Sequence, residues 1–159
     1  MEKRGKDREH PYSHQLQIIS AIIVLGLILL DVFILKFSSK LLAFIPLWVQ
    51  LVCFTTSFTL ALVLGFKSHN ILFKGGEEGP TSLITDGIFA HTRHPLYLAI
   101  LLFHLSFILL TMSILAFFAW IFVILIYNKL ASAEEQILEG MFGDEYLKYK
   151  KQVPKWIPR

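Results

Sequence analysis

The sequence predicts an all-α protein built into a membrane, and its composition and long apolar runs are the observations that indicate this. Of its 159 residues, 55% are hydrophobic and only 17% are charged. A helix needs about 20 apolar residues to cross a bilayer, so the chain holds enough for about four such helices. These figures exclude a water-soluble globular domain and a disordered chain. We therefore expect one integral-membrane domain over residues 1–159, with four transmembrane helices.

The first two spans are expected at residues 16–37 and 41–66. The first run is longer than the core of a signal peptide, which has about 7–15 apolar residues, so we expect it to remain as a helix. It contains Asp31, and a carboxylate inside a span is costly unless it is paired or reaches water. A polar loop over residues 67–94 follows the second span. It contains Gly75, Gly76, Gly79 and Pro80.

The next apolar stretch is expected to form a helical hairpin. Residues 95–127 carry hardly a charge and are too many for one straight span. The weak polar break at Thr111-Met112-Ser113 divides the stretch into spans at 95–111 and 113–130. The hairpin therefore completes the set of four spans.

The end of the chain is expected to leave the membrane. The helical pattern continues to about Glu139, where Gly140 is a natural stop. The remaining tail, residues 131–159, mixes aromatic residues with lysines, as segments at a membrane interface do. Placing both termini in the cytoplasm puts 13 of the 15 Lys and Arg residues on that side, in agreement with the positive-inside rule. We take the net charge of +3 as a topology signal and expect no nucleic-acid partner.

Two polar clusters carry the candidate chemistry. Arg93 and His94 precede Pro95, which suits the first turn of a helix, so both residues lie beside a helix N-terminus that attracts an anion. Glu134 and Glu135 follow the last span on the same predicted side and suit a cation. Together the two clusters fit a zwitterionic ligand. The alternatives are interfacial anchors for the basic pair and an ordinary solvated helix end for the acidic pair.

Other chemistries find less support in the sequence. Tyr97 and His104 fall roughly on the same helix face as His94, but a histidine inside a span is more often a packing residue than a ligand. The six histidines are not placed at metal-ligand spacings and the chain has one cysteine, so we expect no metal site. The sequence also has neither a G-x-G dinucleotide loop nor a Walker lysine motif.

Two motifs resemble those of a known family. The run from Leu83 to Tyr97, L-I-T-D-G-I-F-A-H-T-R-H-P-L-Y, resembles the L-V-T-x-G-x-Y/F-x-x-x-R-H-P-x-Y signature of the isoprenylcysteine carboxyl methyltransferase family, which is related to the phospholipid methyltransferases. Glu134 to Leu138, together with residues 142–154, resembles that family's E-E-x-x-L…F-G-x-x-Y-x-x-Y-x-x-x-V-P ending. The resemblance covers roughly residues 67–158.

The resemblance implies a small helical membrane enzyme that holds S-adenosylmethionine beneath its C-terminal segment. It implies a cofactor pocket formed by Leu83, Ile84, Phe89, Arg93, His94, Pro95, Leu96, Tyr97, Glu134 and Glu135. In the isoprenylcysteine enzymes, an arginine about one turn before the acidic pair contacts the substrate. Here Leu130 takes that position, and the adjacent Lys129 is the candidate substrate-binding residue.

The expected function is methyl transfer from S-adenosylmethionine to a lipophilic acceptor that enters from the bilayer. An isoprenylcysteine carboxyl O-methyltransferase is the favoured type. A lysine cannot reproduce the bidentate fork of an arginine, so a phospholipid amine N-methyltransferase and a small-thiol S-methyltransferase stay open. His91, His94 or a water are candidate bases for an acceptor that must lose a proton. A NADPH-dependent membrane reductase and a four-span scaffold protein without enzymatic activity are the remaining alternatives.

Overall fold

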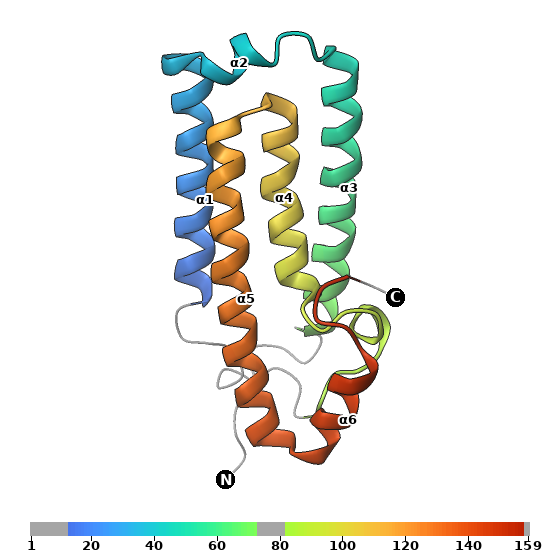
Figure 1. Ribbon diagram of the computed structural model, residues 1–159. Coiled ribbons are helices and arrows are strands. Elements are labelled where there is room, and N and C mark those ends of the chain that lie inside the picture. Colours follow the sequence, from blue (N-terminus) through green and yellow to red (C-terminus); the bar gives the residue numbers. More distant parts are fainter. Residues whose placement is uncertain (1–12, 73–81, 158–159) are drawn as a thin grey trace.

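The computed structural model describes residues 13–72 and 82–157, and every regular element in these ranges is helical. Figure 1 shows α1, α3, α4 and α5 side by side, with α2 near one end of the bundle and α6 beyond the other. The predicted loop residues Gly75, Gly76, Gly79 and Pro80, and the basic residues before Ser13, lie outside the described ranges. In chain order the elements are α1 (Ser13–Leu29), η2 (Leu30–Leu35), α2 (Phe37–Leu41), α3 (Leu47–Leu72), η3 (Gly87–Ala90), α4 (Pro95–Thr111), α5 (Ile114–Phe142) and α6 (Asp144–Gln152).

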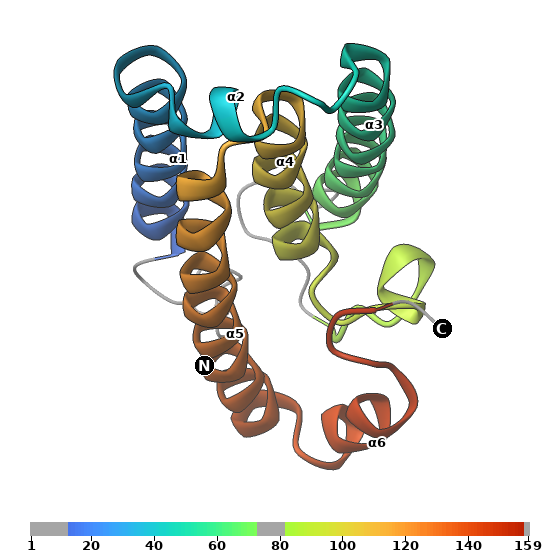
Figure 2. The same ribbon diagram turned by 45° about the horizontal axis from the view of Figure 1, so that its top comes forward.

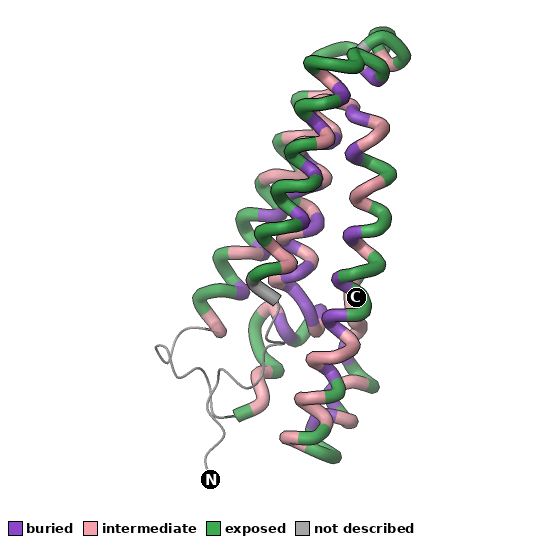
Figure 3. Tube along the Cα trace, turned by 90° about the vertical axis from the view of Figure 1, so that its left-hand side faces the viewer, coloured by how far each residue is buried: buried purple, intermediate pink, exposed green. Residues whose placement is uncertain are grey.

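Three of the described helical segments are long and apolar enough to cross a membrane: Gln15–Leu35, Leu47–Leu72 and Ile114–Phe142. The apolar α4 is shorter, with 17 residues. The predicted all-helical fold is therefore confirmed, and the three long apolar segments agree with a multi-pass membrane protein. Figure 3 shows exposed residues along the outer sides of the helices, as expected where a bilayer replaces water as the solvent.

Helices α1, α4 and α5 share one apolar core, and α3 packs on the other side of α4. The core contains Val24 and Ile28 of α1, Leu101 of α4, and Val123 and other residues of α5. The α3–α4 contact depends on interleaved aromatic rings: Phe54, Phe58, Phe103 and Phe107. The central α4 therefore contacts all three of its long neighbours.

The first helix differs from the continuous span predicted over residues 16–37. Helix α1 widens into the π-helix η2 and stops at Lys36, whose backbone adopts a left-handed conformation with φ 51°. Asp31 accounts for this ending, because it accepts hydrogen bonds from both the backbone N–H (3.1 Å) and the hydroxyl (2.5 Å) of Ser38. The chain must turn back at Lys36 to bring Ser38 to the carboxylate.

Asp31 is fully buried and joins the first helix to the hairpin. Its carboxylate also accepts a hydrogen bond from the hydroxyl of Ser113 (2.6 Å), the residue that caps the N-terminus of α5. The Ser38 hydroxyl in turn accepts from the backbone N–H of Ile114 at 2.9 Å. Asp31 therefore has hydrogen-bond partners inside the protein, and this explains how a carboxylate can be tolerated in a predicted span.

The second predicted span, 41–66, is displaced toward the C-terminus. Helix α3 starts after Pro46, whose carbonyl accepts from the backbone N–H groups of both Val49 (3.0 Å) and Gln50 (3.4 Å). The helix continues past Lys67 to Leu72, because a helix does not need apolar residues to continue. The buried Ser68 is accommodated because its hydroxyl donates to the Leu64 carbonyl one turn earlier. The polar loop predicted at 67–94 therefore begins later than expected.

The hairpin has the predicted position but a longer second arm. Helix α4 has the predicted bounds of 95–111, and Met112 makes the turn with φ 50°. Helix α5 does not stop at Gly140 and instead ends at Phe142. Gly143 takes the positive φ of 55° that ends the helix, and its N–H donates to the Glu139 carbonyl.

Beyond α5 the chain turns back toward the start of α4, as Figure 2 shows. Helix α6 buries Tyr146 and Tyr149 inside the protein, where they pack with Val153, Leu83 and the end of α5. The Tyr149 hydroxyl donates to the Phe89 carbonyl at 2.7 Å, and burial raises the pKa of Tyr149 to about 12. Burial within the protein therefore accounts for these tyrosines, which the sequence alone had suggested as interfacial residues.

Replacing Asp31→Asn should lower the free energy of unfolding by about 2–3 kcal/mol, because the amide loses charge-assisted hydrogen bonds and turns its N–H₂ toward other donors. Equilibrium unfolding in detergent measures this change. The exposed Glu145→Gln on α6 is the matched control and should shift stability by less than about 0.5 kcal/mol. Equal stability of the two variants would show that Asp31 does not hold this end of the bundle together.

Candidate functional site

The two predicted polar clusters meet where α4 begins. His94 is the N-cap of α4, and its φ of −126° and ψ of 58° lie outside the helical region, which the residue before a proline disfavours. Pro95 occupies the first helical position, and no side chain caps the helix. Pro95 itself has no N–H to satisfy, which suits this position.

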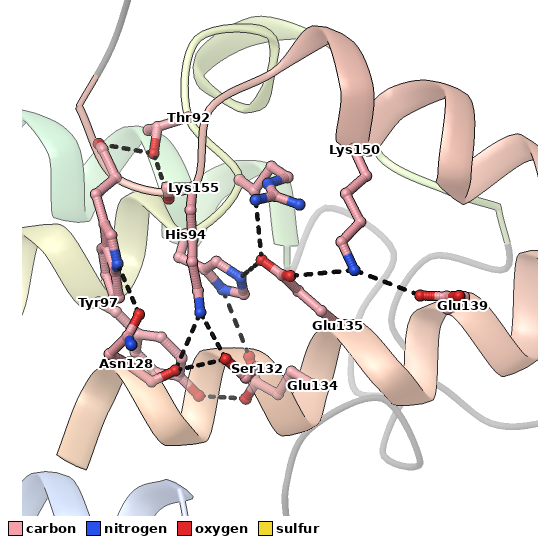
Figure 4. A network of polar contacts seen from close by, with 12 residues as sticks. Thr92, His94, Tyr97, Asn128, Ser132, Glu134, Glu135, Glu139, Lys150 and Lys155 are labelled. Atoms are coloured by element: carbon pink, nitrogen blue, oxygen red, sulfur yellow. Dashed lines mark hydrogen bonds and ion pairs between the residues drawn. The ribbon is translucent and has the colours of Figure 1, made fainter. Parts of the chain in front are cut away.

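His94 and Tyr97 face the acidic pair of α5, as Figure 4 shows. His94 Nε2 lies 3.1 Å from Glu135 Oε1, and Nδ1 lies 3.8 Å from Glu134 Oε2. The Tyr97 hydroxyl donates to Glu134 Oε1, and its ring stacks against His94 with 5.8 Å between centroids. Residues about 40 positions apart in the sequence therefore form one contact.

Glu135 is a centre of positive contacts. In addition to His94, its carboxylate lies 3.4 Å from Arg93 NH2 and 3.6 Å from Lys150 Nζ. Lys150 extends the network to Glu139 at 3.4 Å. The site thus joins α4, α5 and α6 through one buried carboxylate.

Arg93 retains unused donors. Its side chain is 11% exposed, and its Nε and NH1 atoms are buried without a hydrogen-bond partner in the described part of the chain. Buried donors of a charged group are costly to leave unpaired. Arg93 can therefore still donate hydrogen bonds from Nε and NH1 to an anionic partner while its NH2 group contacts Glu135.

The last described residues, 153–157, form a strap across the start of α4. The backbone N–H of Arg93 donates to the Pro154 carbonyl at 3.0 Å. The buried hydroxyl of Thr92 lies 3.0 Å from the carbonyls of both Lys155 and Trp156. The Trp156 ring then lies 5.8 Å from His94. The strap therefore covers the same residues that face the acidic pair.

The strap also contacts α5, through residues that the sequence did not single out. Lys155 Nζ donates to the Asn128 carbonyl (3.0 Å) and to the Ser132 hydroxyl (2.7 Å). The indole N–H of Trp156 donates to the Asn128 side chain at 3.1 Å. Lys129, the predicted substrate-binding residue, is exposed on α5. The lysine beside the cluster is thus Lys155, and no sequence motif indicated it.

Burial decides the protonation state of His94. Burial lowers the pKa of His94 below its ordinary value of 6.5, and this outweighs the hydrogen bond to Glu135, which raises it. The nearby charges of Lys155 and Arg93 act in the same direction as burial. At neutral pH His94 is therefore a neutral ring that donates from Nε2 to Glu135 and keeps Nδ1 as an acceptor.

The other predicted pocket residues lie around this network. Leu83 packs in the apolar cluster of α6, and the Phe89 carbonyl accepts from Tyr149, so both contact the C-terminal segment. Pro95 is buried at the start of α4, whereas Ile84 and Leu96 are half-buried. The part that Ile84 and Leu96 play in ligand binding stays a prediction.

His104 lies apart from the polar cluster. It is 4% exposed in the middle of α4, and its Nδ1 atom has no hydrogen-bond partner among the described residues. Its ring makes an edge contact with Phe103. These surroundings agree with the packing role that the sequence favoured.

Comparison with known proteins places these motifs in a family. The family model described as Phospholipid methyltransferase matches residues 40–145, about two thirds of the chain. This range includes both arms of the hairpin, the basic pair before α4 and the acidic pair of α5.

Curated relatives agree with this match. The chain is 34% identical over 99 residues to the protein-S-isoprenylcysteine O-methyltransferase of Schizosaccharomyces pombe, covering 62% of this chain and 42% of that protein. It is 29% identical over 101 residues to the Saccharomyces cerevisiae protein of the same name, covering 63% and 42%. An uncharacterized protein of Haemophilus influenzae is 41% identical over its whole length, which corresponds to 39% of this chain. The chain thus spans less than half the length of the two yeast relatives.

Lowering the pH below 6.5 should destabilise the protein through His94. Its pKa is lower in the folded than in the unfolded state, so the unfolded state binds the proton first and the stabilisation present above pH 6.5 is lost as the pH falls. Unfolding in detergent at pH 7.5 and 5.0 measures this for the parent and for His94→Gln, which keeps a donor to Glu135. The variant should show the smaller loss, and an equal loss in both would contradict a buried neutral His94.

Thr92→Val should loosen the strap, because it removes both hydrogen bonds to residues 155 and 156 while keeping the shape of the side chain. Hydrogen exchange by mass spectrometry should show several-fold faster deuterium uptake in the peptide that covers residues 150–157. Overall stability should fall by about 1–3 kcal/mol. The exposed Thr85→Val serves as the control. Unchanged uptake in Thr92→Val would mean that other contacts hold the strap.

Proposed function

Because this chain belongs to the phospholipid methyltransferase family, we propose that it is a membrane enzyme that transfers a methyl group from S-adenosylmethionine to a lipophilic acceptor. The observation that carries this proposal is the meeting of the basic start of α4 with the acidic pair of α5. Arg93 and Glu135 are 3.4 Å apart at their closest, and Glu134 lies beside Tyr97. A small zwitterion can therefore touch both signs of charge at once.

The residues present fit the proposed cofactor. S-adenosylmethionine carries a carboxylate, an ammonium and a sulfonium. The unpaired Nε and NH1 of Arg93 suit the carboxylate. Glu134 and the aromatic face of Tyr97 suit the cationic groups. We further propose that the remaining motif residues line the pocket: Leu83, Ile84, Phe89, His94, Pro95, Leu96 and Glu135.

The chain's own part in the reaction is to position two reactants and exclude water. Bound S-adenosylmethionine supplies an electrophilic methyl group, and holding two reactants in line can account for about 7–11 kcal/mol of the barrier. Beside Tyr97, the fully buried Tyr127 and Ala131 keep the site dry on its membrane side. For an acceptor that must lose a proton, Nδ1 of neutral His94 is a candidate acceptor of that proton.

We propose that α4 is a fourth span and that both termini and the polar site lie on the cytoplasmic side. The distribution of Lys and Arg supports this orientation. The cofactor would then arrive from the cytosol and the acceptor from the bilayer. An isoprenylcysteine carboxyl group is the favoured acceptor, because two yeast relatives carry that activity in their names.

Arg93→Met and Glu134→Gln should each weaken binding of S-adenosylhomocysteine at least about tenfold, since each removes one of the charges that hold the zwitterion. Isothermal titration calorimetry on the purified protein in detergent measures this. Glu139→Gln, a half-exposed change one helical turn beyond Glu135, is the matched control and should stay within about twofold. Unchanged affinity in both site variants would defeat the assignment of this pocket.

Incubation with methyl-labelled cofactor and a total lipid extract then identifies the acceptor. A labelled prenylcysteine ester, phospholipid amine or thioether would each identify the chemical class of the acceptor. Stabilisation by NADPH, with none by S-adenosylhomocysteine, would instead favour a reductase.

A further inference from the structure

Lys155 lies beside the candidate site and forms no ion pair with any of the described residues. Its ammonium group donates to the Asn128 carbonyl and the Ser132 hydroxyl, which are both neutral acceptors. No carboxylate of the described residues lies within 4.0 Å of it. Lys150, by contrast, pairs with both Glu135 and Glu139. The two lysines of the same C-terminal segment thus have different electrostatic surroundings.

The position of Lys155 along α5 is equally informative. Asn128 follows the apolar stretch with which α5 begins, so Lys155 Nζ lies where the helix changes from apolar to polar. Figure 4 shows the Lys155 side chain reaching down to Asn128 and Ser132 beside the ring of His94. An ammonium at this level lies where a lipid presents its polar head, next to the proposed cofactor site.

The strap holds Lys155 in this place. The carbonyls of Lys155 and Trp156 are fixed by Thr92, and the Trp156 indole is fixed by Asn128. Lys155 Nζ also lies 5.9 Å from the Trp156 ring centre. Burial lowers the pKa of Lys155, so a bound anion would relieve an existing cost of holding the charge there. The ammonium is thus pre-positioned before any anion arrives.

We propose that the Lys155 ammonium binds an oxyanion of the methyl acceptor, either a carboxylate or a phosphate, and so selects anionic lipids over neutral ones. This inference rests on the proposed function, because it assigns the acceptor side of the same site. It also replaces Lys129 with Lys155 as the substrate-binding lysine. Leu130, at the position where the isoprenylcysteine enzymes carry an arginine, is 5% exposed in the apolar core and offers no charge.

The test measures binding of matched lipophilic probes to the protein saturated with S-adenosylhomocysteine in neutral detergent. The carboxylate pair is N-acetyl-S-farnesylcysteine and its carboxamide, and the phosphate pair is dodecyl phosphate and dodecanol. In the parent protein, at least one anionic probe should bind about tenfold more tightly than its neutral partner. Lys155→Met should reduce that preference to about twofold or less, and Lys155→Arg should restore most of it. The pair that shows the effect identifies the oxyanion.

Two control variants separate charge recognition from the structural role of the strap. Trp156→Phe removes the bond to Asn128 but leaves the ammonium, so it should weaken both members of a pair equally. Lys129→Met removes the exposed charge on α5 and should leave the preference intact. The proposal is overturned if Lys155→Met keeps the preference, if Lys129→Met abolishes it, or if the parent has none. Absence of S-adenosylhomocysteine binding in the parent would instead count against the proposed function itself.

Discussion

The arrangement of the polar end of this protein depends on one buried carboxylate, that of Glu135. It accepts from His94 and lies within 4 Å of charged nitrogens of Arg93 and Lys150, and these partners come from the start of α4 and from α6. The side chain of Glu135 is only 7% exposed, and burying a carboxylate costs free energy unless such partners surround it. Removing one partner would therefore leave part of a buried charge without compensation. The contact therefore fixes where α4 begins relative to α5, and with it the place of Glu134 beside Tyr97.

The opposite end of the bundle is held by a carboxylate as well, but with a different result. Asp31 accepts from the hydroxyls of Ser38 and Ser113 and from the backbone N–H groups of Ser38 and Leu115, so both of its oxygens are used within the protein. Around Glu135, by contrast, two nitrogens of Arg93 remain without partners in the described residues. The network around Asp31, in which every oxygen has a partner, is therefore typical of a structural contact. The network around Glu135, in which Arg93 has unused donors, is typical of a ligand-binding site.

Much of the architecture could be predicted from the sequence, because apolar runs and helix-ending residues act locally. The bounds of α4 follow from such signals. The meeting of Arg93 and His94 with the acidic pair was expected for another reason, because the predicted topology places these opposite charges on the same side of the membrane. The break in the first helix at Lys36 and the strap could not be predicted in this way. Asp31 contacts a residue 82 positions away and Thr92 contacts the chain 63 and 64 positions away, and no local pattern encodes such pairs. Lys155 was therefore indistinguishable in the sequence from the other tail lysines.

The geometry of α5 explains why the cation beside the candidate site comes from the strap and not from α5 itself. The face of α5 that carries Leu130 is buried against α1 and α4, so a charge introduced there would lie in the apolar core. A cation can reach the same level only from outside that core, along the face that carries Asn128 and Ser132. The strap approaches that face and delivers Lys155 to it. If Lys155 binds the acceptor as proposed, acceptor preference can change with the sequence of the strap while the apolar core and the proposed cofactor residues stay the same.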